Sequence, residues 1–252
     1  MSTGKQLRMG RILGEDGRAL VVAMDQGAVA GSMAYLEEPL RAIRAVAEGS
    51  PDSLVLTRGM LKHGWEAIPP RVGMVMRISG GFTVLEGARE FRDRVITGVE
   101  EALRWGADGV VAAVKFGHEL EGEFIQAVSA VADACDRWGM PLLIEAMVAL
   151  RGSAGLSEEE ALAVAARAAA ELGADLVQLR YPAKGGSLVE AIRGCPVPVL
   201  VQCGDAVDED AVLGTVKSAV EDGAAGVALG RNAWQRDDPA PFMRRVHAAL
   251  GR

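Results

Sequence analysis

Histidine, cysteine and aromatic residues are scarce in this sequence. Its 252 residues include 3 His and 3 Cys, and Phe, Trp and Tyr together make up 4%. Cys135, Cys195 and Cys203 lack the spacing of a metal site or a redox pair, and the histidines form no Ser–His–Asp or Cys–His arrangement. We therefore expect reduced thiols, no metal ion and no cofactor.

The sequence also lacks a long hydrophobic run and an excess of basic residues. Its first residues, MSTGKQLRMGRILG, contain no apolar run of the signal-peptide kind, and no later stretch is long enough to span a membrane. The formal net charge is −7, and Lys and Arg are scattered along the chain. These absences predict a cytoplasmic protein that binds neither membrane nor nucleic acid. An anionic substrate would need a local positive site.

What the sequence does contain is a phrase that recurs three times. WGADGVVAAVKF (Trp105–Phe116), LGADLVQLRY (Leu172–Tyr181) and DGAAGVALGR (Asp222–Arg231) each follow an apolar-periodic segment. In each, a glycine ends a helix and a continuous Val/Leu/Ala-rich run follows a short turn. Continuous rather than alternating hydrophobicity is typical of parallel strands that are covered on both faces.

Extending this pattern along the chain predicts a complete set of alternating strands and helices. The predicted strands are Ala19–Asp25, Ser53–Thr57, Val72–Ile78, Gly109–Lys115, Pro141–Met147, Asp175–Arg180, Val197–Gln202 and Gly226–Gly230. The predicted helices are Pro39–Ala47, Glu86–Trp105, Glu119–Trp138, Ser157–Leu172, Ser187–Arg193, Asp208–Glu221 and Asp238–Leu250, with Met60–Ile68 a weaker candidate. Eight such units predict a single (β/α)8 TIM barrel over residues 1–252. The alternative is a doubly wound open sheet, which is disfavoured because no GxGxxG or P-loop opens the first helix.

Polar residues gather where the predicted strands end, which is where barrel enzymes carry their chemistry. They are Asp25 after strand one, Arg77 and Ser79 after strand three, Lys115 at the end of strand four, Glu145 in strand five, and Gln178 and Arg180 in strand six. His118 follows strand four and could either reach the barrel mouth or cap the next helix. A buried charge needs a partner, so adjacent strands four and five predict an ion pair between Lys115 and Glu145, either catalytic or purely structural.

Two glycine-containing segments after the last two strands predict a phosphate site. Gly204 and Asp205 lie in QCGDA after strand seven, and Gly230 and Arg231 lie in LGRN after strand eight. Backbone N–H groups of these loops and a nearby arginine commonly bind phosphate in barrel enzymes. The alternative is that both glycines serve only tight turns.

The segments VVAMDQG, RISGG, WGMPLLIEAM, GCPVPVLVQCGD and AVEDGAAGVALGRNAWQRDDP resemble the DhnA-type class I aldolase family. This group includes archaeal-type fructose-bisphosphate aldolase, the amino-dideoxy-heptulosonate synthases and the autoinducer-2 phosphate thiolase, with tagatose-1,6-bisphosphate aldolase more distant. The resemblance covers nearly the whole chain. It implies a homo-oligomeric barrel that makes or breaks a carbon–carbon bond next to a ketone in a small phosphorylated carbonyl compound.

The resemblance also implies roles for individual residues. It assigns phosphate binding to Gly204, Asp205, Gly230 and Arg231, and it matches Asp25 to the family's acid/base aspartate.

Four further positions concern the covalent chemistry of the family. Lys115 and Glu145 resemble the lysine and glutamate of the tagatose-bisphosphate branch. Ala149 stands at or near the place of a catalytic tyrosine in the fructose-bisphosphate branch, and Gln178 stands where these families carry the Schiff-base lysine. An amide forms no imine, so the usual electron sink is missing at that position.

Three interpretations follow. In the first, the nucleophile has moved to Lys115, whose amine the apolar strand and nearby Arg180 would keep neutral, while Glu145 and Asp25 move protons. In the second, the protein carries out a related lyase, isomerase or aldol reaction without an imine, and Lys115, Arg77 and Arg180 stabilise an enolate by charge and hydrogen bonds. In the third, the barrel binds a sugar phosphate without catalysis.

Lys184 in the AKGG loop is a remaining candidate nucleophile.

Overall fold

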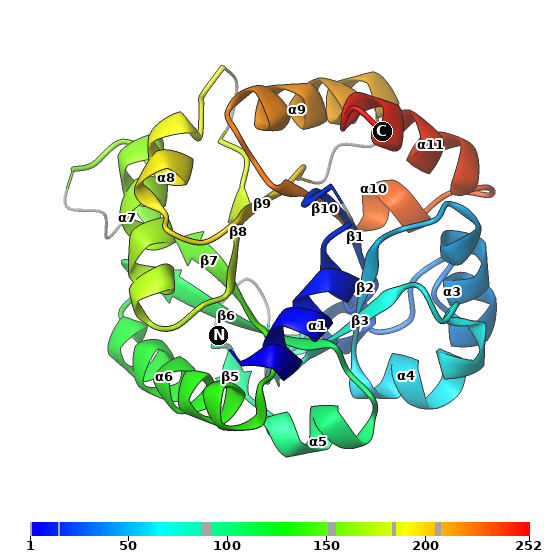
Figure 1. Cartoon of the computed structure of the whole chain (residues 1–252), viewed down its shortest axis with the longest axis horizontal. Coiled ribbons are helices and arrows are strands. Elements are labelled where there is room, and N and C mark those ends of the chain that lie inside the picture. The colour runs from blue at the N-terminus through cyan, green and yellow to red at the C-terminus, as the bar shows by residue number, and fades with distance from the viewer. Residues whose placement is uncertain (1, 15, 87–91, 151–154, 183–184, 205–207) are drawn as a thin grey trace.

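The computed structural model describes residues 2–14, 16–86, 92–150, 155–182, 185–204 and 208–252. Eight strands of this part of the chain close into a parallel barrel, so the predicted (β/α)8 fold is confirmed (Figure 1). In barrel order the strands are β1 (Ala19–Ala23), β10 (Gly226–Leu229), β9 (Val199–Gln202), β8 (Leu176–Arg180), β7 (Leu142–Val148), β6 (Gly109–Phe116), β3 (Gly73–Arg77) and β2 (Ser53–Leu56).

Helices surround the barrel, as the periodicity of the connecting segments predicts. The outer helices are α3 (Pro39–Glu48), α4 (Arg58–Gly64), α5 (Val99–Arg104), α6 (Glu121–Trp138), α7 (Glu158–Glu171), α8 (Val189–Gly194), α9 (Glu209–Glu221) and α11 (Ala240–Ala249). Shorter turns are α2 (Gly27–Ala30), α10 (Arg231–Trp234), η1 (Trp65–Ala67) and η2 (Val84–Glu86). The Ser157 side chain accepts from the backbone N–H of Glu160, and the Glu160 side chain accepts from the backbone N–H of Ser157, so α7 begins with a capping box.

The barrel has two separate apolar layers, because each strand sends alternate side chains to opposite faces. The outer layer packs between the strands and the helices. The inner layer consists of Ile12, Ala19, Val21, Val55, Val75, Val111, Leu143, Leu176, Leu200 and Ala228. The next inward-facing positions toward the C-terminal strand ends are polar in several strands. The interior near the N-terminal strand ends is therefore an apolar plug, and the interior near the C-terminal strand ends is a polar mouth.

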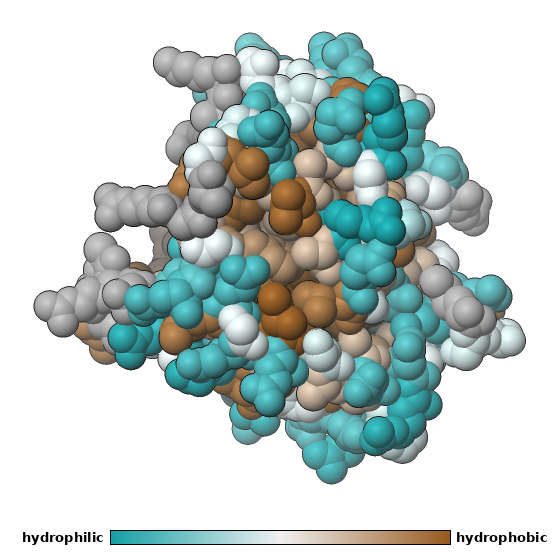
Figure 2. All heavy atoms as spheres, turned by 90° about the vertical axis from the view of Figure 1, so that its left-hand side faces the viewer, coloured by the Kyte–Doolittle hydropathy of each residue, from teal (hydrophilic) through white to brown (hydrophobic). Residues whose placement is uncertain are grey.

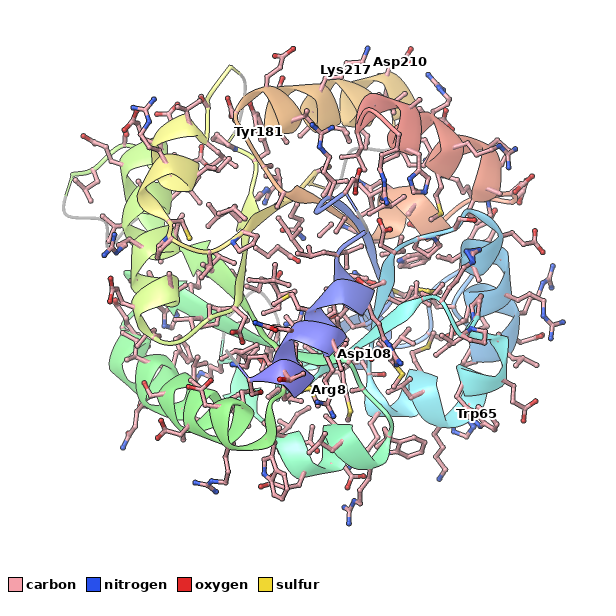
Figure 3. The ribbon with its side chains drawn as sticks, viewed as in Figure 1. Arg8, Trp65, Asp108, Tyr181, Asp210 and Lys217 are labelled. Atoms are coloured by element: carbon pink, nitrogen blue, oxygen red, sulfur yellow. The ribbon has the colours of Figure 1, made fainter. Side chains whose placement is uncertain are left out.

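A helix that the sequence pattern did not predict closes the bottom of this plug. In Figure 1, α1 (Thr3–Ile12) crosses the end of the barrel, and Ile12 belongs to the inner apolar layer. Polar contacts attach the helix at its rim: Arg8 donates to the carbonyl of Gly139 at 3.0 Å, and Arg11 contacts Asp108 at 3.2 Å (Figure 3). Because α1 contains few apolar side chains, apolar periodicity gives no signal for it.

We expect Gly73→Ala to destabilise the fold by about 1–3 kcal/mol, the usual cost of forcing extra volume into a packed core. A Cβ at Gly73 would lie 2.2 Å from the carbonyl oxygen of Arg11, so α1 would have to shift away from the barrel. Urea unfolding measures the loss. The matched control is Gly122→Ala, where nothing lies within 4 Å of the added Cβ. Equal stability of the two variants would contradict this role of Gly73.

The predicted helix Glu86–Trp105 is wrong in its first half. Within the described residues, Arg94–Val95 form strand β5, which pairs with β4 (Ser79–Gly80) in an antiparallel hairpin, and α5 begins only at Val99. The run VIT followed by Gly98 explains the difference, because β-branched residues favour strands and glycine opens the helix. The hairpin is not part of the ring of helices, and it lies at the barrel mouth.

Apolar side chains gather in a hollow of the face shown in Figure 2, with a hydrophilic border around them. Helices α6 and α7 lie on this side, and their exposed large apolar residues include Trp138 and Val164. Contiguous apolar surface is typical of interaction sites, but the predicted homo-oligomer stays a prediction. The described helices include none with the length and apolar character needed to cross a membrane.

Candidate active site

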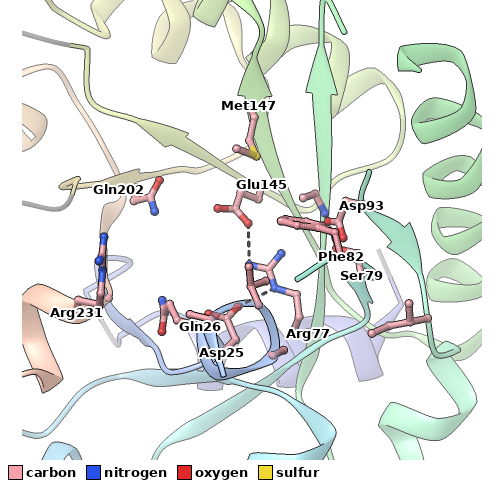
Figure 4. Close-up of a pocket in the computed structure, with 18 of the residues that line it drawn as sticks. Asp25, Gln26, Arg77, Ser79, Phe82, Asp93, Glu145, Met147, Gln202 and Arg231 are labelled. Carbon is pink, nitrogen blue, oxygen red and sulfur yellow. Dashed lines mark hydrogen bonds and ion pairs between the residues drawn. The ribbon is translucent and has the colours of Figure 1, made fainter. Parts of the chain in front are cut away.

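A cavity of about 550 Å³ opens at the carboxyl ends of the barrel strands (Figure 4). Its polar lining comes from segments that are far apart in sequence and includes Asp25, Arg77, Asp93, Glu145, Gln202 and Arg231. Apolar side chains, among them Val29, Met33, Phe82, Ile96 and Met147, complete the wall. The volume suits a small organic molecule, and a few convergent polar groups in an apolar wall are typical of a ligand site.

Arg77 lies at the centre of the polar groups and joins two carboxylates. Its Nε donates to Asp25 Oδ2 and its Nη2 to Glu145 Oε2, both at 2.7 Å. Burial acts to lower the pKa of Arg77, but the charges and hydrogen bonds of Glu145 and Asp25 outweigh it and raise the pKa above its ordinary value. The guanidinium therefore stays charged, and its Nη1 carries two further N–H donors.

Gln178 lies beside this cluster rather than in the cavity wall. It pairs with Glu145 in the β7–β8 register, is 6% exposed, and donates from Nε2 to Glu145 Oε1 at 3.4 Å. At that distance the bond is weak, so Gln178 supports the orientation of Glu145 without fixing it. Chemically it offers an amide where a lysine would offer an amine.

Lys115 occupies the inner face of the barrel at the end of β6. It is in register with Met147, whose side chain lines the cavity, while Ala113 one step below is in register with Glu145. The sequence assigned to Lys115 the role of cation beside Glu145, and the structure shows Arg77 in that role. A Lys115–Glu145 contact stays a prediction.

Two further predicted residues have different surroundings. The side chain of Arg180 is exposed, and its Nη2 lies 3.9 Å from the point that a Cβ on Gly204 would occupy, so it stands beside the loop after β9. His118 Nδ1 accepts from the backbone N–H of Leu120 at 3.1 Å, and its ring packs on Phe124. His118 thus makes local contacts just before α6, which has no side-chain cap, and is not among the described residues that line the cavity.

The loops after β9 and β10 meet at one side of the cavity. Gly204, Gly230 and Arg231 all line it, and Gly204 has φ of +69°, which glycine adopts without strain. Asn232 ties the loops together: its Oδ1 accepts from the backbone N–H of Gly230 at 2.9 Å and its Nδ2 donates to the carbonyl of Gly204 at 3.2 Å. Asp205 and Lys184 lie outside the described residues.

The structure brings several residues to the cavity that the sequence analysis gave no role. Gln202 was visible in the QCGDA segment, and Gln26 adjoins Asp25. Asp93 and Phe82 gave no usable signal, because both belong to the hairpin connection rather than to a barrel strand. Strand β7 contributes Glu145 and Met147 to the cavity wall. Ala149, at or near the place of the family's catalytic tyrosine, is not among the described residues that line the cavity.

Within the described ranges, no three His, Cys, Asp or Glu side chains come close enough together to hold a metal ion. Burial raises the pKa of Cys203, next to the loop after β9, to about 12, which keeps the thiol protonated near neutral pH.

The fold and this mouth define a barrel enzyme of the aldolase class. Residues 19–236 match the DeoC/LacD family of aldolases, and the chain belongs to that family. This confirms the resemblance that the sequence motifs indicated. The chain is an aldolase-like carbon–carbon lyase.

Relatives with curated names align over almost the whole chain. The chain is 35% identical over 248 residues to 2-amino-4,5-dihydroxy-6-oxo-7-(phosphonooxy)heptanoate synthase of Streptomyces griseus, covering 96% of this chain and 88% of that protein. It is 31% identical over 244 residues to 2-amino-3,7-dideoxy-D-threo-hept-6-ulosonate synthase 1 of Archaeoglobus fulgidus, covering 97% and 90%. A 3-hydroxy-5-phosphonooxypentane-2,4-dione thiolase of Escherichia coli is 31% identical over 250 residues, with 98% and 82% covered.

Solved structures agree with this assignment. A Schiff-base-forming fructose-1,6-bisphosphate aldolase superposes with a TM-score of 0.85 at 26% identity, covering 98% of this chain and 99% of that one. An archaeal fructose-1,6-bisphosphate aldolase, described with its catalytic Lys covalently bound to a carbinolamine intermediate, gives a TM-score of 0.85 at 25% identity, with 98% and 99% covered.

Proposed function

We propose that this protein makes or breaks a carbon–carbon bond next to a ketone in a small phosphorylated carbonyl compound. The observation that supports the proposal is one cavity with Arg231 and two loop glycines at one side and a guanidinium–carboxylate cluster at its centre. The names of two of the relatives above contain a phosphonooxy group, which supports the phosphorylated substrate class.

The phosphate would bind at the side of the cavity that Arg231, Gly204 and Gly230 line. Arg231 would supply a charge-assisted bond, and Gly204 would let the backbone approach the anion closely. The Gly230 N–H is engaged by Asn232, so it fixes the loop rather than the phosphate. The net charge of −7 makes this local positive site necessary.

Bond cleavage would then proceed at Arg77. The Asp25 carboxylate takes the proton of the substrate hydroxyl, whose electron pair forms the aldehyde carbonyl as the carbon–carbon bond breaks. The electrons of that bond pass to the ketone and give an enolate, whose oxygen Arg77 stabilises through its charge and Nη1 donors. The proton held on Asp25 returns to the enolate carbon, so the residues end as they began.

Lys115 is a second candidate for the electron sink. Its inward register beside Met147 places it at the barrel mouth, where an amine could form an imine with the ketone. The cavity wall nevertheless contains Arg77 rather than Lys115, so the geometry favours enolate stabilisation without an imine.

Borohydride trapping separates these two routes. The protein is incubated with dihydroxyacetone phosphate and related ketose phosphates, reduced, and mapped by mass spectrometry, and turnover is assayed for the native chain and for Lys115→Met. We expect no adduct, and turnover within about tenfold of native in Lys115→Met, since that residue would not carry the electron pair. An adduct on Lys115 would transfer the role to this amine. Absence of turnover across the whole panel would contradict the substrate class.

A further inference from the structure

Asp93 is a buried carboxylate in the wall of the cavity that the proposed mechanism does not use. It is 5% exposed, and its Oδ2 accepts from the hydroxyl of Ser79 at 2.7 Å. The Ser79 oxygen in turn accepts from the backbone N–H of Ala113 at 3.0 Å. The direction of this chain is therefore fixed: Ala113 donates to Ser79, and Ser79 donates to Asp93.

The other carboxylate oxygen of Asp93 is buried and has no hydrogen-bond partner among the described residues. A buried polar atom without a partner is costly, and such an atom is uncommon in a folded protein unless a ligand or water meets it. Burial raises the pKa of Asp93, while the hydrogen bond from Ser79, the charge of Arg77 and the backbone N–H of Arg94 oppose that rise. The fold thus holds an unsatisfied oxygen next to a ligand cavity.

The charges around this oxygen define what it can meet. Among the residues that line this end of the cavity, Asp25, Glu145 and Asp93 are carboxylates. Arg77 is the guanidinium between Asp25 and Glu145, so with all four ionised their sum is negative. In Figure 4 Arg231 lies on the opposite side, with Glu145 and Arg77 between it and Asp93. Arg231 follows β10, and the connection that contains Asp93 follows β3. In the barrel, β10 and β3 are not neighbours: β1 and β2 separate them in one direction, and the four strands β9 to β6 separate them in the other.

A substrate whose phosphate lies at Arg231 would therefore place its far end near Asp93. A second phosphate there would lie next to carboxylates in a partly buried site. The negative charges of the phosphate and the carboxylates would repel each other. A hydroxyl or ammonium would instead give the buried oxygen the hydrogen bond that it lacks.

We propose that Asp93, held by Ser79, recognises a hydrogen-bond donor at the end of the substrate remote from the phosphate, so that the site accepts monophosphates and rejects bisphosphates. The inference rests on the proposed function, because the phosphate at Arg231 sets the direction of the bound molecule. Asp93 is then a specificity-determining residue rather than a catalytic one.

The test compares fructose 1-phosphate with fructose 1,6-bisphosphate by isothermal titration calorimetry on the full chain. We expect the native protein to bind the monophosphate at least about tenfold more tightly, given the repulsion of the second phosphate. Asp93→Asn keeps the size of the side chain and an acceptor for Ser79 but removes the charge. We expect it to reduce the preference by about tenfold or more, mainly through tighter binding of the bisphosphate.

Two variants make the result decisive. Ser79→Ala leaves the carboxylate in place but removes the bond that orients it, so we expect a shift of the preference in the same direction as Asp93→Asn, and smaller. Arg231→Ala should weaken both ligands alike, because both carry the first phosphate. If the native protein binds both ligands equally and Asp93→Asn changes nothing, the role of Asp93 is overturned while the proposed function stands. If neither ligand nor dihydroxyacetone phosphate binds, the proposed function fails and this inference fails with it.

Discussion

Replacing Arg77 by methionine should lower the free energy of unfolding by about 3–5 kcal/mol, the usual cost of removing one partner from a buried ion pair. The side chains of Arg77, Asp25 and Glu145 are 16%, 10% and 16% exposed, so water reaches them only partly. Without the guanidinium, two carboxylates would face each other across the barrel mouth with no counter-charge from Arg77. Urea unfolding followed by circular dichroism measures the loss.

A double variant tests the cause of this loss. Glu145→Gln added to Arg77→Met removes one of the two uncompensated charges, so it should recover a large part of the lost stability. If the double variant is as unstable as the sum of its single changes, repulsion between the carboxylates is not the reason. Arg77→Lys is the matched control for charge alone, since an ammonium cannot make the two-pronged contact of the guanidinium.

Asp25→Asn should reduce kcat by about 10²–10⁴-fold while the fold remains stable, the range expected for loss of a general base. The amide oxygen can still accept from Arg77 Nε, and Arg77 and Glu145 remain a balanced pair. What disappears is the group that takes the substrate proton. Steady-state kinetics with whichever ketose phosphate the native protein turns over, together with a thermal unfolding curve, separates catalysis from stability.

Glu145→Gln is the matched variant for Asp25→Asn, because it makes the same chemical change at the other end of Arg77. We assign the proton transfer to Asp25, so kcat should fall less in Glu145→Gln than in Asp25→Asn. The reverse order would move the acid/base role to Glu145, and two unchanged values would remove both carboxylates from the chemistry.

The barrel itself was predictable because its signal is local and repeated. Each buried strand is a short continuous apolar run after a turn, and all eight predicted strands reach the observed limits within two residues at both ends, from Ala19–Ala23 to Gly226–Leu229. Such runs identify strands, and an uninterrupted alternation with helices leaves few topologies to consider.

The hairpin connection after β3 was not predictable in the same way. Its residues Ser79–Gly80 and Arg94–Val95 pair with each other across a long connection, and neither pair has a periodicity of its own. A two-residue strand depends on its partner rather than on its own sequence, so propensity gives no signal. Asp93 was hidden for that reason, since a carboxylate in a predicted helix suggests a solvent-exposed side chain.

The class of fold, the aldolase family and the strand ends at which polar residues gather could all be predicted from the residues in order. Which of those residues meet depended on the three-dimensional arrangement. It placed Arg77 between Asp25 and Glu145, set Gln178 beside Glu145, turned His118 to the start of α6 and brought Asp93 into the wall. The physical reason is that periodicity fixes the face of a strand from neighbouring residues alone, whereas an ion pair depends on the register and side-chain reach of elements that are distant in the chain.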